Sequence, residues 1–168
     1  MIIRTEQPAD AAAIGDLTYA AFLNHPVHAP GALPDEHILV DALRAANALS
    51  LSLVATIDEQ IVGHIAFSPV TINNADLGWY GIGPLSVIPA KQKQGIGSAL
   101  MLQGLELIRE RGASGCVLVG YAAYYNRFGF QGSTTLTLKN VGPKFLLAMA
   151  FVGEIPTASV VFHAAFDA

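Results

Sequence analysis

The stretch from Leu85 to Gly97 constrains the fold more than any other part of the chain. An apolar run ends at Pro89, a polar and basic loop follows, and two glycines, Gly95 and Gly97, precede a segment with a helical pattern. The first turn of a helix has backbone N–H groups without intrahelical partners, and the helix dipole favours negative charge there. Because glycine has no Cβ, an anion can approach the backbone closely. The sequence therefore predicts a strand, an anion-binding loop and a helix in succession.

Two nucleotide-binding motifs do not fit this loop. The Walker A motif ends in Gly-Lys-Ser/Thr, whereas Gly97 is followed directly by Ser98. The dinucleotide fingerprint requires a third small residue and, about 20 residues later, a carboxylate that binds ribose, and the sequence has neither. A nucleotide-binding α/β protein of another kind stays open as an alternative.

The composition limits the class of protein. The chain has 168 residues, 52% of them hydrophobic, so residues 1–168 are expected to form a single domain with a sizeable core. A formal net charge of −4 argues against nucleic acid as a partner. The single cysteine, Cys116, excludes an intrachain disulfide and suits a reducing compartment, so a cytoplasmic protein is expected. Neither a signal peptide nor a membrane span is predicted.

Hydrophobic periodicity predicts an α/β chain with strands on both sides of the central helix. In the second predicted helix, Ile38, Leu39, Ala42 and Leu43 are expected to face inward. Helices are expected after Asp10, from Asp35, from Gly95 to Arg111, at Tyr121–Phe128 and at Pro143–Ala150. Strands are expected at Ile2–Arg4, Leu51–Ile57, Gln60–Pro69, Trp79–Val87, Cys116–Gly120, Thr134–Leu138 and Ser159–Phe162.

Pro84 interrupts the predicted central strand at 79–87. Proline has no N–H to donate to a neighbouring strand, so its presence predicts a bulge or a break in pairing. Such a break leaves backbone groups of Leu85 to Val87 free to pair with an extended ligand. This strand, the helix and the strand at 116–120 are predicted to form a right-handed crossover, which connects two parallel strands.

Two motifs in this order resemble those of the GNAT superfamily of acyl-CoA-dependent N-acetyltransferases. The Q-x-x-G-x-G pattern from Gln92 to Gly97 is similar to the pyrophosphate loop of that superfamily, and Tyr125-x-x-x-Gly129-Phe130 is similar to the end of a helix that follows it. Further resemblance to a bacterial branch of unassigned substrate covers nearly the whole chain, through His64–Pro69, Gly83–Val87 and Phe162–Phe166. One departure is Gly120-Tyr-Ala, where that branch often has Gly-Asp-Pro, so the site has one acid fewer.

The resemblance implies a GNAT fold of the α/β class, with a mixed, mostly antiparallel central sheet that is splayed at a parallel strand pair and flanked by helices. It implies transfer of an acetyl group from acetyl-CoA to a primary amine by direct attack, with no metal. The residues that it implies for binding acetyl-CoA are Leu85, Val87, Gln92, Lys93, Gln94, Gly95, Ile96, Gly97, Ser98 and Asn126.

For the chemistry, the resemblance and the residue types together favour Tyr125 as the proton donor to the leaving thiolate, with Tyr124 as second choice. Ser86 could hold a water that takes the proton from the amine, and His64 is an alternative base. The acceptor is expected to be a small-molecule or peptide amine, bound by the loop His25–Pro34 and the tail around 143–153; no nucleic acid or membrane is expected as a partner, and a homodimer is left open. The alternative function is a non-catalytic acyl-CoA-binding or regulatory module.

Overall fold

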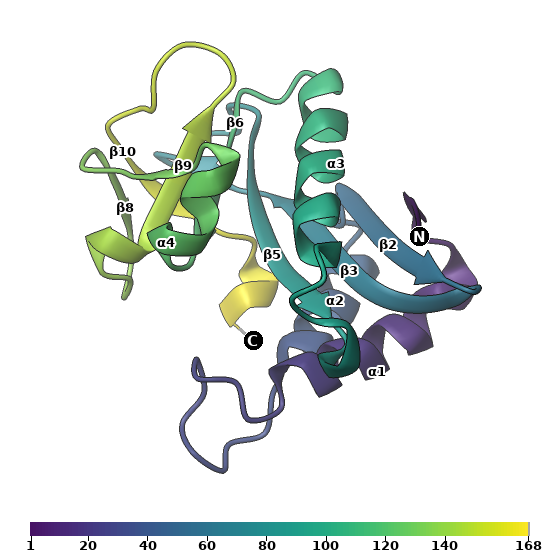
Figure 1. The fold of residues 1–168 in the computed structure, drawn as a ribbon. Helices are drawn as coiled ribbons and strands as arrows, with labels where there is room; N and C mark the ends of the chain where they lie inside the picture. Colours follow the sequence, from purple (N-terminus) through teal and green to yellow (C-terminus); the bar gives the residue numbers. More distant parts are fainter. Residues whose placement is uncertain (168) are drawn as a thin grey trace.

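A computed structural model describes residues 1–167, and Ala168, the last residue of the expected domain, lies outside the described part. In this part of the chain, strands form one large and one small sheet (Figure 1). The large sheet has the order β1 (Ile2–Thr5), β2 (Leu51–Ile57), β3 (Gln60–Pro69), β5 (Trp79–Val87), β6 (Gly115–Val119), β9 (Leu146–Ala150) and β7 (Gln131–Gly132). The small sheet has the order β4 (Thr71–Ile72), β10 (Ala158–Val161) and β8 (Leu136–Leu138).

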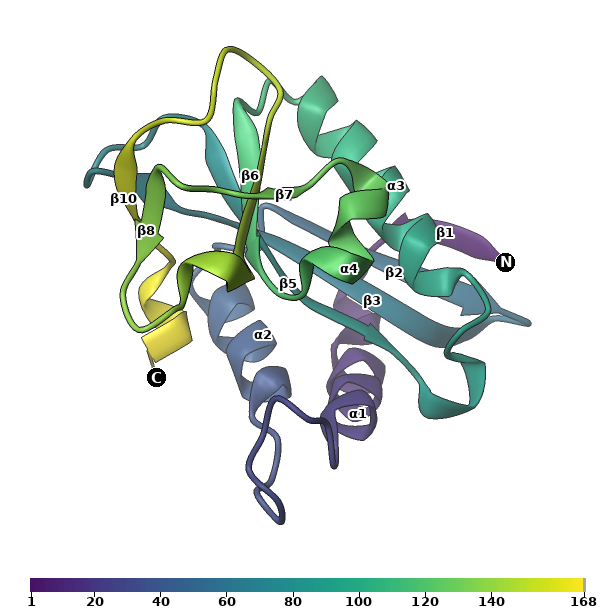
Figure 2. The same ribbon diagram turned by 60° about the vertical axis from the view of Figure 1, so that its left-hand side comes forward.

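The helices cover both faces of the large sheet, as Figure 2 shows. One face carries α1 (Ala11–Phe22) and α2 (Glu36–Ala45), and the other carries α3 (Ile96–Glu110) and the short α4 (Ala122–Tyr125). The face of α3 that packs on the sheet contains Leu100, Met101, Gly104, Leu105 and Ile108, which are all buried. No helix within residues 1–167 has an apolar stretch long enough to cross a lipid bilayer.

Strand β5 is where the sheet divides. Its register with β3 shifts between Ile65 and Phe67, next to the cis peptide bond Gly83–Pro84, which confirms the irregularity predicted from Pro84. The parallel pairing of β5 with β6 extends only from Trp79 to Gly81, opposite residues 115–117. Beyond Gly81 the two strands separate, and β5 curves away from β9 and α4 toward α1 (Figure 1). The predicted splayed parallel pair is therefore present.

Two predictions about elements are wrong. Residues 143–150 are not a helix; Pro143–Phe145 forms a 3-10 turn, and β9 follows it as a strand between β6 and β7. This run is apolar and buried on both faces of the sheet, so its pattern does not distinguish a strand from a helix. In α2, Ile38 is exposed, and Val40 and Leu43 form the buried face together with Ile14 of α1 and Val54 of β2.

Candidate active site

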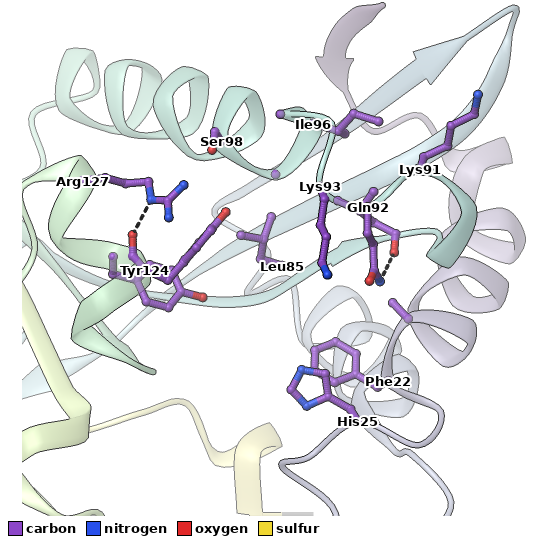
Figure 3. A pocket seen from close by; sticks show the side chains of 15 residues that line it. Phe22, His25, Leu85, Lys91, Gln92, Lys93, Ile96, Ser98, Tyr124 and Arg127 are labelled. Atoms are coloured by element: carbon purple, nitrogen blue, oxygen red, sulfur yellow. Dashed lines mark hydrogen bonds between the residues drawn. The ribbon is translucent and has the colours of Figure 1, made fainter.

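A cavity of about 700 Å³ lies at the end of β5, beside the N-terminus of α3 and the helix α4 (Figure 3). Figure 3 shows its walls: Tyr124 and Arg127 lie on one side, Phe22, His25 and Lys93 lie on the other, and Leu85 lies between them. The lining residues are Ala21, Phe22, His25, Leu85, Val87, Lys91, Gln92, Lys93, Gly95, Ile96, Gly97, Ser98, Tyr124, Tyr125 and Arg127.

The N-terminus of α3 forms an anion-binding end of this cavity. Gly95 is the N-cap residue at a φ of 86°, in the left-handed region that glycine adopts without strain, and no side chain caps the helix. The first-turn N–H groups are therefore available to a ligand, where the dipole also favours an anion. Lys91, Lys93 and Arg127 add positive charge, and none of the lining residues is Asp or Glu.

The end of β5 presents backbone groups to the opening between β5 and β6. The Ile88 N–H donates to the Val62 carbonyl at 2.9 Å, so even-numbered residues here direct their backbone groups toward β3. Since backbone direction alternates along a strand, the groups of Leu85 and Val87 point the other way. The Gln92 side-chain amide donates to the Val87 carbonyl at 3.0 Å, and this bond fixes the loop against the strand.

Tyr124 and Tyr125 both line the cavity, with their rings edge-to-face at 4.8 Å between centroids. Burial, together with the neighbouring Tyr124, raises the pKa of Tyr125 to about 12, so its hydroxyl keeps its proton at neutral pH. The Tyr124 hydroxyl is directed at Gly97, where it would lie 3.2 Å from an added Cβ. The Arg127 guanidinium lies over the Tyr124 ring at 4.5 Å and donates to its carbonyl at 2.9 Å.

Three of the residues singled out from the sequence do not line the cavity. Ser86 is buried between β5 and the α1 face of the sheet, Gln94 donates to the Ala90 carbonyl at 3.4 Å, and Asn126 is exposed. The cavity also contains residues that the sequence analysis did not place there, namely Ala21, Phe22, Lys91 and Arg127. Arg127 could have been found from its position inside the tyrosine motif. Ala21 and Phe22 could not be found from the sequence, because α1 and β5 are distant in the chain and meet only in the fold.

His64 and Cys116 are buried and lie outside the cavity. The imidazole of His64 is bonded through Nε2 to the Ser52 hydroxyl at 2.8 Å, and burial lowers its pKa to about 4. Burial raises the pKa of the Cys116 thiol, so the reactive thiolate is suppressed.

One further cluster of polar side chains joins the loop at 25–34 to α2. His28, Asp35 and Glu36 each place a potential ligand atom within 4.8 Å of the others. The His28 Nε2 atom already contacts a Glu36 carboxylate oxygen at 2.8 Å, so a hydrogen-bonded pair accounts for the arrangement.

Comparison with known families identifies the class of protein to which this chain belongs. Residues 48–132 match the family model described as the acetyltransferase (GNAT) domain. The chain belongs to the GNAT family and is an N-acetyltransferase.

Relatives in this family share most of the chain. The N-acetyltransferase YhbS of Escherichia coli (strain K12) is 39% identical over 132 residues, which are 78% of this chain and 74% of YhbS. A crystal structure of a GNAT acetyltransferase from Brucella melitensis in complex with acetyl-CoA is 49% identical, covers 99% of this chain and 97% of that one, and has a TM-score of 0.86. The structure of E. coli YhbS in complex with CoA is 32% identical, covers 99% and 92% of the two chains, and has a TM-score of 0.89.

Proposed function

We propose that this N-acetyltransferase moves an acetyl group from acetyl-CoA to a primary amine by direct attack of the amine on the thioester. The observation that carries the proposal is one cavity that joins the uncapped start of α3, the unpaired edge of β5 and Tyr125. We also propose that residues 1–168 act as one domain, since the large sheet takes strands from both ends of the chain, β1 and β9.

The cavity suits a long ligand with an anionic middle and a thin, hydrogen-bonding tail. The start of α3, with Lys93 nearby, offers N–H groups and positive charge to a diphosphate. The backbone N–H and carbonyl of Leu85 and the N–H of Val87 are available to pair with an amide-containing chain, as at the edge of a sheet. Relatives crystallised with acetyl-CoA and with CoA support this choice of ligand.

In the proposed binding mode, Gln92 to Ser98 surround the diphosphate, and Leu85 and Val87 pair with the pantetheine chain. Lys91 and Arg127 add positive charge at the rim of the same cavity. Gln94 and Asn126 lie outside its lining, so their proposed contacts are with outer parts of the ligand.

Acetyl-CoA supplies the activated acetyl group, and side chains of the protein donate and accept protons. Tyr125 is the proposed proton donor to the departing thiolate, because this residue lines the cavity and its pKa of about 12 keeps it protonated. Ser86 is proposed to hold the water that takes the proton from the amine, since Ser86 itself lies outside the cavity lining.

The acceptor amine is proposed to enter beside Phe22 and His25, on the side of the cavity opposite Tyr124. The loop from His25 to Pro34 carries no Asp, Glu, Lys or Arg, which favours an uncharged or weakly polar acceptor. Whether the acceptor is a small molecule or a peptide is left open, and so is a homodimer. Action in the cytoplasm is proposed from the single, buried cysteine.

The experiment that tests the proposal measures thiol release from acetyl-CoA across a panel of small-molecule and peptide amines. Amine-dependent release that falls in Tyr125→Phe supports the enzyme. Binding of CoA without turnover on any amine would instead favour a non-catalytic acyl-CoA-binding module. Titration with ATP, NAD and CoA tests the nucleotide-binding alternative, and we expect only CoA to bind.

A further inference from the structure

A row of buried polar side chains crosses the α1 face of the large sheet, from the strand that borders the cavity to the opposite edge. The row contains Ser86 on β5, His64 on β3, Ser52 on β2 and Glu6, which follows β1. Ser86, His64 and Ser52 are at most 6% exposed, in a layer where the neighbouring residues are apolar. The burial of a polar side chain costs free energy unless the side chain makes hydrogen bonds, so this row requires an explanation.

The hydrogen bonds along the row fix the tautomer of His64. The Ser52 hydroxyl donates to the Glu6 carboxylate at 2.8 Å, and an ionised carboxylate can only accept. Its single proton is thereby used, so the contact of 2.8 Å between Ser52 Oγ and His64 Nε2 requires Nε2–H to be the donor. In a neutral imidazole the other nitrogen, Nδ1, is then a bare acceptor.

The bare Nδ1 atom of His64 is buried and has no hydrogen-bond partner, and the same is true of the Ser86 hydroxyl. The two residues are directly opposite each other in the β3–β5 register, so their side chains share one face of the sheet. No hydrogen bond joins the two atoms in the structure, so the relay requires either rotation of Ser86 about χ1 or one water between them. Thr18 of α1 adds another buried hydroxyl without a partner on the helix that packs against these strands.

The two ends of the row lie next to different cavities, although the Ser86 hydroxyl is buried just outside the lining of the larger one. Ser86 lies between Leu85 and Val87, which both line the large cavity, and Ala21 and Phe22 of α1 bring that cavity to the same face of the sheet. Glu6 and Ser52 line a second cavity of about 230 Å³ together with Arg44. Arg44 donates to both Glu6 oxygens, at 2.8 and 2.9 Å, and keeps this carboxylate ionised.

We propose that His64 accepts, through the Ser86 hydroxyl, the proton that the amine loses in acetyl transfer, and that Ser52 and Glu6 hold its ring in the required tautomer. The amine proton passes to a water held by Ser86, that water gives a proton to Ser86 Oγ, and the Ser86 hydroxyl proton passes to His64 Nδ1. The imidazolium formed keeps its Nε2–H bond to Ser52, and the Glu6 carboxylate balances part of its charge. After the products leave, the proton returns along the same path. This role rests on the proposed acetyl transfer, and it makes His64 a positioned relay that does not itself touch the substrate.

The charged groups around His64 act in opposite directions. Glu6 favours the protonated ring, whereas Arg44 of α2 and the burial of the ring disfavour it. From α1, the titratable Asp16 and Tyr19 line a separate groove and do not face the row. The ring is therefore neutral at pH 7 with Nδ1 free of a proton, and burial makes it a weaker base than an ordinary histidine.

The kinetic test uses His64→Gln, Ser52→Ala and Glu6→Gln, with the best amine of the panel as acceptor. We expect kcat to fall about 100-fold in His64→Gln and about 10-fold in the other two, with the KM for acetyl-CoA unchanged. The loss of kcat/KM at acidic pH that His64 imposes on the wild type should disappear in His64→Gln. Ser68→Ala is the matched control, because Ser68 is an equally buried hydroxyl on the same face of β3 outside the row. Its kcat should stay within about twofold of the wild type.

A second measurement does not require the acceptor to be known. Nitrogen-15 NMR of labelled histidine should show His64 with Nε2 protonated and Nδ1 bare at pH 7, and Ser52→Ala should lose this preference. An Nδ1–H tautomer in the wild type would overturn the relay, as would folded His64→Gln with wild-type kcat and pH profile. Failure of the wild type to acetylate any amine would overturn the proposed function and the relay together, whereas an Nδ1–H tautomer in an active enzyme would overturn the relay alone.

Discussion

At the scale of single residues, the site depends on how its surroundings set the proton affinity of two side chains. Tyr125 holds its proton more tightly than an ordinary tyrosine, and His64 holds one less tightly than an ordinary histidine. Both shifts have burial as their first cause, since low-polarity surroundings disfavour the charged form of each group. At pH 7 Tyr125 is therefore protonated and His64 is neutral, the states that a proton donor and a proton acceptor require, while each shift weakens the group as an acid or a base.

Replacement of Tyr125 by Phe should lower kcat by about 100-fold, because the thiolate then leaves without a proton donor. The KM for acetyl-CoA should change little, since the phenyl ring keeps its packing against Tyr124 and Phe130. Steady-state kinetics with acetyl-CoA and the best amine measure both values. Tyr121→Phe is the control, because this tyrosine starts the same helix but is 64% exposed and lies outside the cavity. Equal kcat values in wild type and Tyr125→Phe would remove Tyr125 from the chemistry.

The histidine makes folding stability depend on pH in a defined window. Its folded-state pKa of about 4 lies below its ordinary value of 6.5, so between these values the unfolded chain binds more protons. The stability contributed by neutral His64 is complete above 6.5 and is lost as the pH falls through about 4, by ~3 kcal/mol in total. Urea unfolding at pH 7, 5.5 and 4.5 measures it.

His64→Gln should flatten that pH dependence, because glutamine does not titrate. The Glu6 carboxylate also contributes to pH dependence: burial opposes its charge, but Arg44 and Ser52 lower its pKa, so its stabilisation is lost only as the pH falls below the ordinary value of 4.5. If His64→Gln loses stability between pH 6.5 and 4.5 as steeply as the wild type, the pH dependence does not come from a lowered pKa of His64.

At the scale of elements, the start of α3 is the part most specialised for an anion. Gly97→Asp should weaken acetyl-CoA binding about 30-fold, or by ~2 kcal/mol, because a carboxylate would face the diphosphate. Isothermal titration calorimetry measures the dissociation constant. Gly15→Asp in α1 is the control; it adds the same charge at a helical glycine where a Cβ meets nothing within 4 Å. If both variants bind equally well, the anion does not lie at this helix.

The strands were predictable from sequence where turns separate them clearly. The bounds of β2, β3 and β5 agree with the prediction, since Asp58-Glu59 and the turn at 73–78 end alternating apolar runs. The strand β9 was predicted as a helix because a short, fully buried apolar run has no distinguishing period. The loop at 92–98 could be recognised because its chemistry is local. The polar row from Glu6 to Ser86 could not, because its members come from four separate segments and become neighbours only through strand register.

At the scale of the whole molecule, the divided sheet should respond to its ligand as a unit. A chain that pairs with Leu85 and Val87 on one side and reaches α4 on the other would connect both halves. Acetyl-CoA at 100 times its dissociation constant should raise the free energy of unfolding by about 2.7 kcal/mol. Thermal melts with acetyl-CoA, ATP and NAD test this, and we expect a shift only with acetyl-CoA. An equal shift with ATP would favour the nucleotide-binding alternative.

The short parallel contact between β5 and β6 also has a consequence for local opening. Only Trp79 to Gly81 of β5 pair with β6, so the amide hydrogens of Leu85 and Val87 have no strand partner on that side. In the absence of ligand these two amides should exchange with deuterated solvent much faster than those of Ser86 and Ile88, which face β3. A pantetheine chain bound along β5 should accept hydrogen bonds from these two amides and slow their exchange selectively.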